Sequence, residues 1–341
     1  MSTRRSLNFA AALLSEIPVA VILVNPAWEI VLYDGQAATL LERFAPLRLR
    51  APLADYFSAD SLAAAKAVLG RAVGEATLQL ETANKSDRFD ARFKPVGNDS
   101  YRLTIECEAA LTLEKTQPRP MIYDFDLLEP QPNGNVEDSD LDDLCFVVFD
   151  CETTGLSTET DEVIQLGAVR ILNGRIVEGE VFDTYVKPSG PIPRASTEVH
   201  GISDSDVATA PSFPEVGRAF HKFARDAVLV AHNAPFDVAF LRRFESEMGV
   251  KWQNPVLDTV LLSAACFGTT EDHSLDGLCD RLAVSFPEGT RHTALGDAQA
   301  TAAVLLAMIP LLRSRSITTF GEARAESRRH HRLLKSVDLG G

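Results

Sequence analysis

The chain has 341 residues, of which 45% are hydrophobic and 24% are charged, and its formal net charge is −15. This length favours two domains, and the hydrophobic fraction is ordinary for a globular protein. The acidic balance argues against a broad nucleic-acid-binding surface, since such surfaces are basic. It does not exclude a protein that grips a few nucleotides at one end.

The first residues and the cysteines indicate a cellular compartment. Arg4 and Arg5 precede an apolar run that ends at Leu14, as in a signal peptide, but a convincing cleavage site is lacking. Five cysteines without a CxxC pair suit reduced thiols. No segment reaches the ~18–20 consecutive apolar residues of a membrane helix. We expect a short N-terminal helix, a cytoplasmic protein and no membrane partner.

The first region, residues 10–114, alternates strand-like and helix-like patterns. Strands are predicted at residues 19–24, 29–33, 89–93 and 101–105. Helical spacing is found at residues 36–44 and 61–73. Two strands, helices and then antiparallel strands predict a small α+β domain.

The opening of this region, residues 17–26 and 30–38, resembles that of PAS domains. It departs from the family where an Asn usually precedes the helix, because Asp34-Gly35 stands there. The resemblance implies a PAS-like sensory or dimerisation domain over residues 10–114, with a second copy or another protein as its partner. The alternative is another small α+β module without a sensing role.

Residues 115–143 are predicted to be an acidic linker. Four prolines interrupt this stretch, and from Asp124 to Asp143 it carries eight acidic residues with no base between them. Such runs are normally solvated and flexible. An apolar patch at residues 123–128 is expected to dock onto one of the domains.

From residue 144 the pattern predicts a mixed sheet covered by helices. Residues 163–172 read as a strand, Asn173-Gly174 as a tight hairpin turn, and residues 177–186 as the returning strand. A short buried strand at 228–231 then leads into a helix at 237–248. An antiparallel hairpin followed by alternating strands and helices gives an α/β domain.

Carboxylates stand at three separate places in this region. Asp150 and Glu152 end an apolar run and, being two residues apart on a strand, project from the same face. Cys151 between them is expected to point to the opposite face as a small buried residue. Asp237 follows a plausible helix N-cap, Asn233, where interaction with the helix dipole is the alternative role.

The last carboxylate, Asp297, lies in the opening turn of a helical run at residues 298–308, and His292 precedes it on an expected mobile loop. Buried carboxylates require neutralisation, and oxygen ligands suit Mg²⁺ or Mn²⁺. An imidazole titrates near pH ~6.5 and can accept a proton at neutral pH. The alternative for His292 is an ordinary exposed histidine.

In this order and spacing, Asp150, Glu152, Asp237, His292 and Asp297 resemble the DEDDh 3′→5′ exonuclease family, which includes the proofreading epsilon subunit of bacterial DNA polymerase III. The resemblance covers residues 144–312. It implies a ribonuclease H-like fold, two divalent metal ions held by the four carboxylates, and His292 as general base. The implied products are nucleoside 5′-monophosphates from single-stranded or frayed DNA 3′ ends.

Five further residues are predicted to shape the substrate end. The resemblance assigns the turn with Thr153, Thr154 and Leu156 to the 3′ nucleotide and His200 to the terminal base. Phe236 precedes Asp237 and is predicted to stack on a base, since base–aromatic stacking is sequence-tolerant. Core packing is the alternative for Phe236 and Leu156. For His200 the alternative is a bond to a neighbouring backbone carbonyl.

Two other functions stay open at this point. The carboxylates do not distinguish DNA from RNA, so an exoribonuclease acting on RNA 3′ ends or short oligoribonucleotides is one alternative. A non-catalytic PAS signalling scaffold is the other. The basic tail, residues 313–341, is expected either to contact phosphate or to form a solvated helix.

Overall fold

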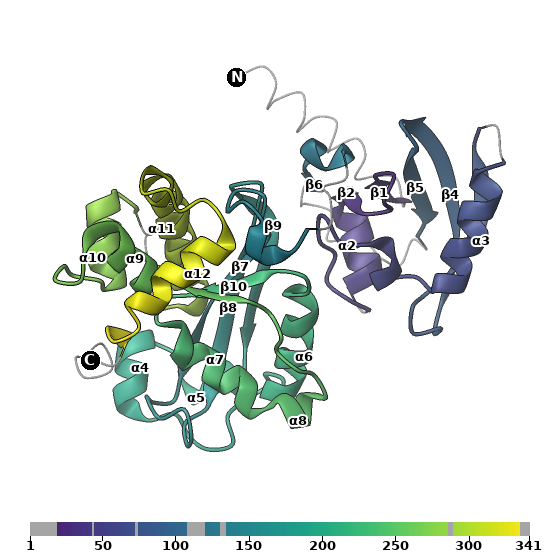
Figure 1. The fold of residues 1–341 in the computed structure, drawn as a ribbon. Coiled ribbons are helices and arrows are strands. Elements are labelled where there is room, and N and C mark those ends of the chain that lie inside the picture. Colours follow the sequence, from purple (N-terminus) through teal and green to yellow (C-terminus); the bar gives the residue numbers. More distant parts are fainter. Residues whose placement is uncertain are drawn as a thin grey trace. The chain divides into compact units, whose positions relative to one another are not determined.

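The computed structural model describes residues 19–42, 44–71, 74–107, 120–129, 134–285 and 289–334. The chain forms two compact units, residues 1–133 and 134–341, and each contains its own sheet (Figure 1). The helix predicted near residues 7–14 lies outside the described residues. All five cysteines are buried free thiols, as their pattern predicted.

The first unit is an antiparallel sheet in the order β3-β4-β5-β1-β2-β6. Its strands are β1 (Val19–Val24), β2 (Ile30–Asp34), β3 (Ala76–Glu81), β4 (Arg88–Gly97), β5 (Ser100–Glu106) and β6 (Met121–Tyr123). The α-helices described in it are α2 (Gly35–Glu42) and α3 (Ala59–Leu69), with a 3₁₀ turn η1 (Leu53–Asp55) between them. The predicted α+β order is confirmed, although β3 and β6 were not predicted. The PAS-like assignment stays a prediction.

Part of the predicted linker belongs to this first unit. Strand β6 pairs with β2, and the following 3₁₀ turn η2 (Phe125–Leu128) buries Leu127. The Asn25 side chain donates a hydrogen bond of 2.9 Å to the Leu127 carbonyl. Of the apolar patch predicted to dock onto a domain, Leu127 is therefore buried against the first unit, whereas Tyr123, Phe125 and Leu128 are exposed.

The second unit is a five-stranded mixed sheet in the order β11-β10-β7-β8-β9. Its strands are β7 (Phe146–Thr153), β8 (Val163–Leu172), β9 (Arg175–Tyr185), β10 (Val228–Ala231) and β11 (Val256–Asp258). Strands β7, β8 and β9 are antiparallel neighbours, whereas β10 runs parallel to β7 and β11. Asn173 and Gly174 have φ values of 49° and 67°, as a tight hairpin turn requires. The predicted ribonuclease H-like sheet is confirmed.

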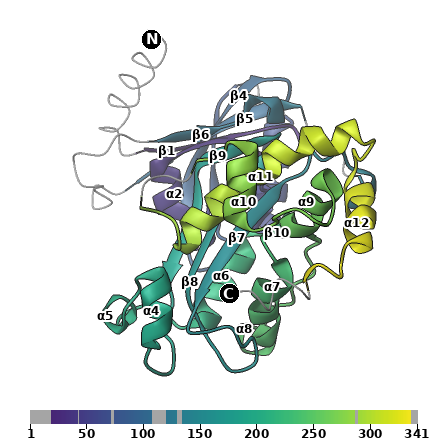
Figure 2. The ribbon, with the colours of Figure 1, turned by 90° about the vertical axis from the view of Figure 1, so that its left-hand side faces the viewer.

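Helices cover both faces of this sheet (Figures 1 and 2). They are α4 (Arg194–His200), α5 (Asp204–Val207), α6 (Phe213–Phe223), α7 (Ala234–Arg243), α8 (Glu245–Met248), α9 (Thr259–Phe267), α10 (Leu275–Leu282), α11 (Ala294–Ser314) and α12 (Phe320–Arg329). On one face Phe220 of α6 packs against Phe149, with ring centroids 5.3 Å apart. The single helix predicted at 237–248 is instead α7 and α8, interrupted at Phe244.

The other face carries α11, which lies against β7 and β8. Phe146, Val148 and Val169 meet Val304 and Met308 in one buried cluster. By length and composition α11 is apolar enough to cross a membrane. Its burial against the sheet accounts for that composition, since a helix buried on most of its surface is apolar almost all round.

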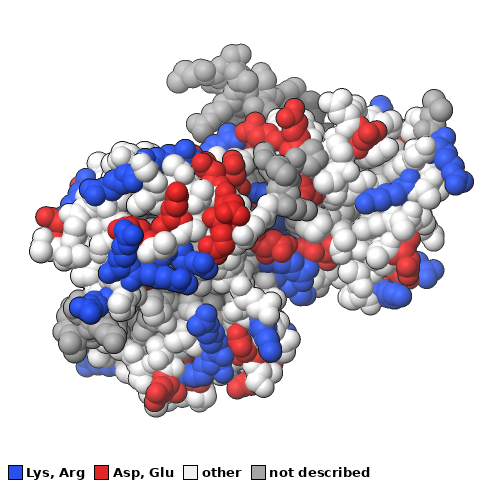
Figure 3. Space-filling model, in the orientation of Figure 1, with Lys and Arg blue, Asp and Glu red and all other residues white. Residues whose placement is uncertain are grey.

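The segment 134–143 and the start of the basic tail pack against each other. The 3₁₀ turn η3 (Val136–Asp138) touches α12, and Arg324 bonds Glu137 at 2.7 Å. Arg313 forms ion pairs with Asp140 and Asp142. Figure 3 shows acidic and basic side chains side by side in the region of α12. The described part of the linker thus differs from the expected solvated chain, whereas the tail forms the expected helix, and opposite charges and the buried Phe320 hold the two together.

The first turn of α11 approaches the β8 backbone closely. Gly167 pairs with Asp150, and a Cβ added to it would lie 2.1 Å from the Leu295 nitrogen. Two residues earlier, Gln165 accepts a hydrogen bond of 3.3 Å from the Ala294 N–H. A glycine at this position therefore allows the N-terminus of α11 to reach the end of β7.

We predict that Gly167→Ala will displace the first turn of α11, because the added methyl would overlap backbone atoms that cannot rotate away. The free energy of unfolding should fall by roughly 1–3 kcal/mol, measured by urea unfolding of the full chain. Gly190→Ala is the matched control, since nothing lies within 4 Å of its added Cβ. Equal stability of the two variants would contradict the prediction.

Candidate metal centre

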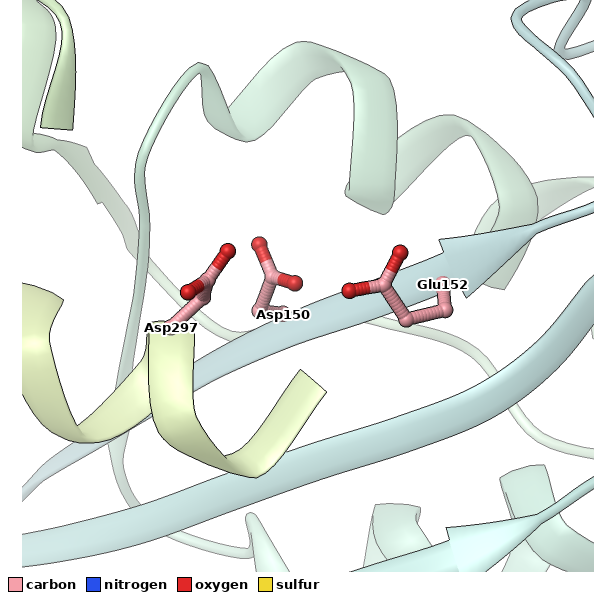
Figure 4. A group of neighbouring side chains, drawn as sticks. All are labelled: Asp150, Glu152 and Asp297. Atoms are coloured by element: carbon pink, nitrogen blue, oxygen red, sulfur yellow. The ribbon is translucent and has the colours of Figure 1, made fainter. Parts of the chain in front are cut away.

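Three of the predicted carboxylates meet at the end of β7. Asp150 and Glu152 project from that strand, and Asp297 comes from the first turn of α11. Each contributes an oxygen, and these oxygens lie within 4.8 Å of one another. Figure 4 shows the three carboxylates pointing into one space between the strand and the helix. Residues about 150 positions apart in the sequence thus form one acidic group.

Asp237 lies beside this group but outside it. It sits in the first turn of α7, is 3% exposed, and is close enough for its charge to raise the pKa of Asp150. Burial raises the pKa of Asp237, and the hydrogen bonds that its carboxylate accepts from the thiol and the backbone N–H of Cys151 act in the opposite direction. Cys151 is buried as predicted, but its thiol also has this polar partner.

The start of α7 is stabilised differently from the prediction. Asn233 occupies the N-cap position with φ 63°, yet its side chain makes no capping hydrogen bond. Asp258 instead accepts 2.8 Å hydrogen bonds from the N–H groups of both Ala234 and Val260. One buried carboxylate therefore caps both α7 and α9, and burial raises its pKa to about 6.

His232 precedes this helix start as a hydrogen-bonding residue. Its Nδ1 lies 2.9 Å from the Thr259 hydroxyl. Burial lowers the pKa of His232 to about 4, with smaller contributions from Arg291 and His273. The imidazole is therefore neutral at physiological pH.

His292 lies on an exposed turn next to Asp297. Its φ is 61°, and its backbone N–H donates a 3.4 Å hydrogen bond to Asp297. The ring Nδ1 is 3.3 Å from a guanidinium nitrogen of Arg291. The ring is not part of the three-carboxylate group, so its role as general base stays a prediction.

The carboxylates carry more negative charge than their surroundings neutralise. Burial, followed by the charges of Asp237, Glu152 and Asp297, holds the pKa of Asp150 well above its ordinary value. Burial also raises the pKa of Glu152 to about 7 and that of Asp237 to about 8, and it raises the pKa of Asp297. Buried carboxylates this close to one another lose their protons readily only when a cation binds between them.

This donor set fits hard divalent cations. Asp150, Glu152 and Asp297 offer carboxylate oxygens in one space, with Asp237 beside them. Oxygen ligands suit Mg²⁺ and Mn²⁺, whereas Zn²⁺ favours nitrogen and sulfur. The geometry can therefore hold the kind of ion that the sequence predicted.

The turn after β7 is organised by Asp161. The Thr154 hydroxyl donates to Asp161 at 3.2 Å, and a Cβ on Gly155 would lie 2.6 Å from the same carboxylate. The Thr153 hydroxyl donates to the Gly155 carbonyl at 2.7 Å. Both threonines predicted to bind substrate are 9% exposed and shape this turn through their hydroxyls.

Leu156, by contrast, is 77% exposed at the tip of this turn. Val199 on the neighbouring helix α4 is also exposed, at 60%. The Ser196 hydroxyl of α4 donates a 2.7 Å hydrogen bond to the Thr154 carbonyl and joins the two segments. Core packing is thus ruled out for Leu156, and Val199 is an exposed apolar residue that the sequence did not single out.

The other two predicted substrate residues are more enclosed. His200 is 8% exposed, and its Nδ1 accepts a 3.0 Å hydrogen bond from the Ile202 N–H. Burial lowers its pKa, while a hydrogen bond with the Thr153 backbone acts in the opposite direction. Phe236 is half-buried and packs edge-on against Phe240. His200 therefore makes the backbone contacts, and Phe236 the packing contact, that were the alternatives to substrate binding.

Arg291 is the charged neighbour of the centre that the sequence did not identify. It forms ion pairs with Asp297 and with Asp276 of α10. The sequence could have pointed to Arg291 only through its position directly before His292. Gln165 and Gly167 were also missed, since their contact with α11 depends on the tertiary packing of α11 on β8.

A mixed sheet of this order, with carboxylates from β7 and the first turn of α11, is the ribonuclease H-like arrangement that the sequence predicted. Residues 147–305 match the model of the family described as Exonuclease.

Curated relatives match part of this chain. A "DNA polymerase III subunit epsilon-like protein" of Rhodobacter capsulatus is 58% identical over 221 residues, covering 64% of this chain and 31% of the relative. A "DNA polymerase III PolC-type" protein of Caldanaerobacter subterraneus is 42% identical, covering 52% and 12% respectively. The chain thus spans less than a third of the length of either relative.

A solved structure, "Exonuclease X in complex with 5' overhanging duplex DNA", aligns with a TM-score of 0.42 and 23% identity. The alignment covers 53% of this chain and 99% of that chain.

We predict that the metal-free protein loses stability as the pH rises from about 4 to about 8. The raised pKa values of Glu152 and Asp237 mean that the folded state holds protons which the unfolded state releases near pH ~4. Thermal unfolding in chelator should therefore show a falling midpoint across this window. Added Mn²⁺ should raise the midpoint more at pH 8 than at pH 5, because ligands bind metal when deprotonated.

Glu152→Gln should flatten the pH profile in chelator, since it removes one of the titrating groups. Glu198→Gln, on the exposed surface of α4, serves as the control and should keep the wild-type slope. A wild-type midpoint that is constant or rises from pH 5 to pH 8 in chelator would show that the carboxylates are not destabilising.

Proposed function

We propose that this protein is a metal-dependent 3′→5′ exonuclease that releases nucleoside 5′-monophosphates from single-stranded or frayed DNA 3′ ends. The observation that carries the proposal is the meeting of Asp150, Glu152 and Asp297 in one acidic group. The match of residues 147–305 to the exonuclease family model supports the reaction class. The names of both relatives, which refer to DNA polymerase III, favour DNA as the substrate.

The four carboxylates would hold two divalent cations, Mg²⁺ or Mn²⁺. Asp150, Glu152 and Asp297 surround one space, and Asp237 lies on its border. When bound, such ions supply positive charge to the phosphate and acidify water. Positive charge at this point also accounts for nucleic-acid binding by a chain with a net charge of −15.

His292 is the residue proposed to accept a proton. A water molecule attacks the phosphorus that links the last two nucleotides, and the imidazole takes one of its protons. The bond from phosphorus to the 3′ oxygen of the preceding nucleotide breaks, and that oxygen acquires a proton from solvent. The terminal nucleotide leaves as a 5′-monophosphate, and the shortened strand has a new 3′ hydroxyl.

Substrate contacts are proposed for the turn after β7 and the adjacent α4. Leu156 and Val199 are apolar side chains exposed to solvent, which suits contact with the faces of bases. Thr153 and Thr154 shape the backbone of the turn and would place it against the 3′ nucleotide. His200, which bonds the Thr153 backbone, is proposed to support the terminal base, and Phe236 is proposed to stack on a base.

We predict that Asp150→Ala will reduce mononucleotide release by a factor of roughly 10²–10⁴, because it removes a ligand worth several kcal/mol of transition-state stabilisation. The rate is measured on an end-labelled oligonucleotide with saturating Mn²⁺. His292→Ala should lower kcat by about 10²–10⁴ through loss of general base catalysis.

Asp280→Asn on the exposed face of α10 is the charge control and should retain the wild-type rate. Circular dichroism should show that all the variants are folded. Near-normal activity of Asp150→Ala with abundant metal would refute the proposed site. No metal-stimulated mononucleotide release from the wild type would favour the non-catalytic scaffold.

The polarity and sugar preference follow from one time course. Matched DNA and RNA oligonucleotides, labelled at the 5′ end, are incubated with Mg²⁺, Mn²⁺ or chelator. We expect a ladder of DNA products shortened from the 3′ end in the presence of either metal. Faster shortening of RNA would favour the exoribonuclease alternative, and release of the 5′ label as a mononucleotide would contradict the proposed polarity.

We predict that Leu156→Ser will raise KM for single-stranded DNA several-fold and leave the folding stability unchanged. The side chain is 77% exposed, so its loss removes few contacts within the protein but about 1 kcal/mol of apolar contact with a base, a factor of about five. Steady-state kinetics measure the effect. Val181→Ser, at an exposed position on β9, provides the control for loss of a surface apolar group.

The role of the first unit is a separate proposal. We infer that it supplies a protein contact, with a second copy of the chain or another protein as its partner, in a cytoplasmic setting. The observation in favour is that the unit has its own sheet and core, with Tyr33, Tyr56 and Phe93 fully buried. Light scattering of the full chain over a range of concentrations tests self-association.

A further inference from the structure

Arg291 connects the metal centre with a carboxylate on the rim. Its Nε and Nη2 donate to the two oxygens of Asp276 at 2.8 and 3.1 Å, and its Nη1 donates to Asp297. Asp276 lies in the first turn of α10, and Asp297 in the first turn of α11. One guanidinium thus links an expected metal ligand to a carboxylate outside the three-residue group.

The two carboxylates differ in burial, and therefore in how strongly a nearby cation stabilises their ionised form. The Asp297 side chain is 11% exposed, whereas that of Asp276 is 62% exposed. A buried carboxylate without a cation is strongly unfavourable, while an exposed ion pair contributes little. The guanidinium lowers the pKa of Asp297 against the effect of burial. Arg291 therefore provides positive charge that Asp297 would otherwise take from a metal ion.

Asp276 limits this effect of Arg291. It binds the guanidinium with both oxygens, and such paired contacts hold the planar group in a defined orientation. A guanidinium held at the rim can leave Asp297 and still keep a partner. Without Asp276, the full attraction of Arg291 would be directed at Asp297 and the other carboxylates of the centre.

The position of Arg291 in the chain also couples it to the predicted general base. Residue 292 follows directly, has φ 61°, and its ring lies 3.3 Å from Nη1 of Arg291. If the guanidinium moves away from Asp297, its distance from the imidazole therefore changes as well.

We propose that Arg291 is a positioning residue that pairs with both Asp297 and Asp276 in the metal-free protein and keeps only Asp276 when a divalent cation binds, so that Asp276 sets the metal affinity of the centre. This inference rests on the proposed function, since it assumes a metal at Asp297. It predicts opposite effects on the metal affinity for substitutions of Arg291 and of Asp276.

The test is isothermal titration of the full chain with Mn²⁺ at pH 7.5, without nucleic acid. Arg291→Gln removes the competing cation and should tighten the binding that involves Asp297 by about fivefold, the equivalent of one ion pair of ~1 kcal/mol. Asp276→Asn should weaken that binding by about two- to fivefold. Arg291→Lys keeps the charge without the paired geometry and should lie between Arg291→Gln and the wild type.

Long-range charge alone would produce changes of the same sign, so matched controls are needed. Asp272→Asn removes an acidic residue whose charge, like that of Asp276, raises the pKa of the nearby His232. Arg281→Gln removes an arginine that pairs with Glu271 instead. Both controls should change the Mn²⁺ dissociation constant less than twofold.

Equal effects of Asp272→Asn and Asp276→Asn, or weaker binding by Arg291→Gln, would overturn the inference and leave the proposed function intact. Thermal unfolding in chelator verifies that each variant is folded, and Asp276→Asn tests the idea independently if Arg291→Gln does not fold. Absence of Mn²⁺ binding by the wild type would instead refute the metal centre itself, and with it both proposals.

Discussion

Asp297 reaches Asp150 and Glu152 because the first turn of α11 touches the backbone of β8. Gly167 permits this approach, since any side chain there would meet the helix backbone. Gln165 secures the same turn by accepting the Ala294 N–H. The acidic group is therefore a consequence of helix-on-sheet packing at one point, and the apolar residues of α11 hold that packing in place.

The carboxylates of this centre repel one another, and the protein neutralises only part of their negative charge. Burial and mutual repulsion raise the pKa values of Asp150, Glu152 and Asp237. Arg291 offsets some of the charge at Asp297. An apo centre of this kind favours either protons or cations, so its stability, its metal affinity and its proposed chemistry all have one physical origin.

Acidic and basic residues far from the centre have a different role. Glu137, Asp140 and Asp142 pair with Arg313 and Arg324, and the Leu141 N–H donates to the Thr318 carbonyl. The segment that enters the second unit is thereby attached to its last helices. A run of like charges that suggests a solvated chain is thus ordered here, because residues of opposite charge near the other end of the domain pair with it.

Local patterns in the sequence were sufficient for most strands, for the hairpin at Asn173-Gly174 and for the identity of the acidic residues, because periodicity and turn chemistry are local properties. They were not sufficient for β6, for the capping of α7 by Asp258, or for Arg291, whose partners are distant in the chain. Convergence of Asp150, Glu152 and Asp297 required the tertiary structure, since only the contact between α11 and β8 brings them together.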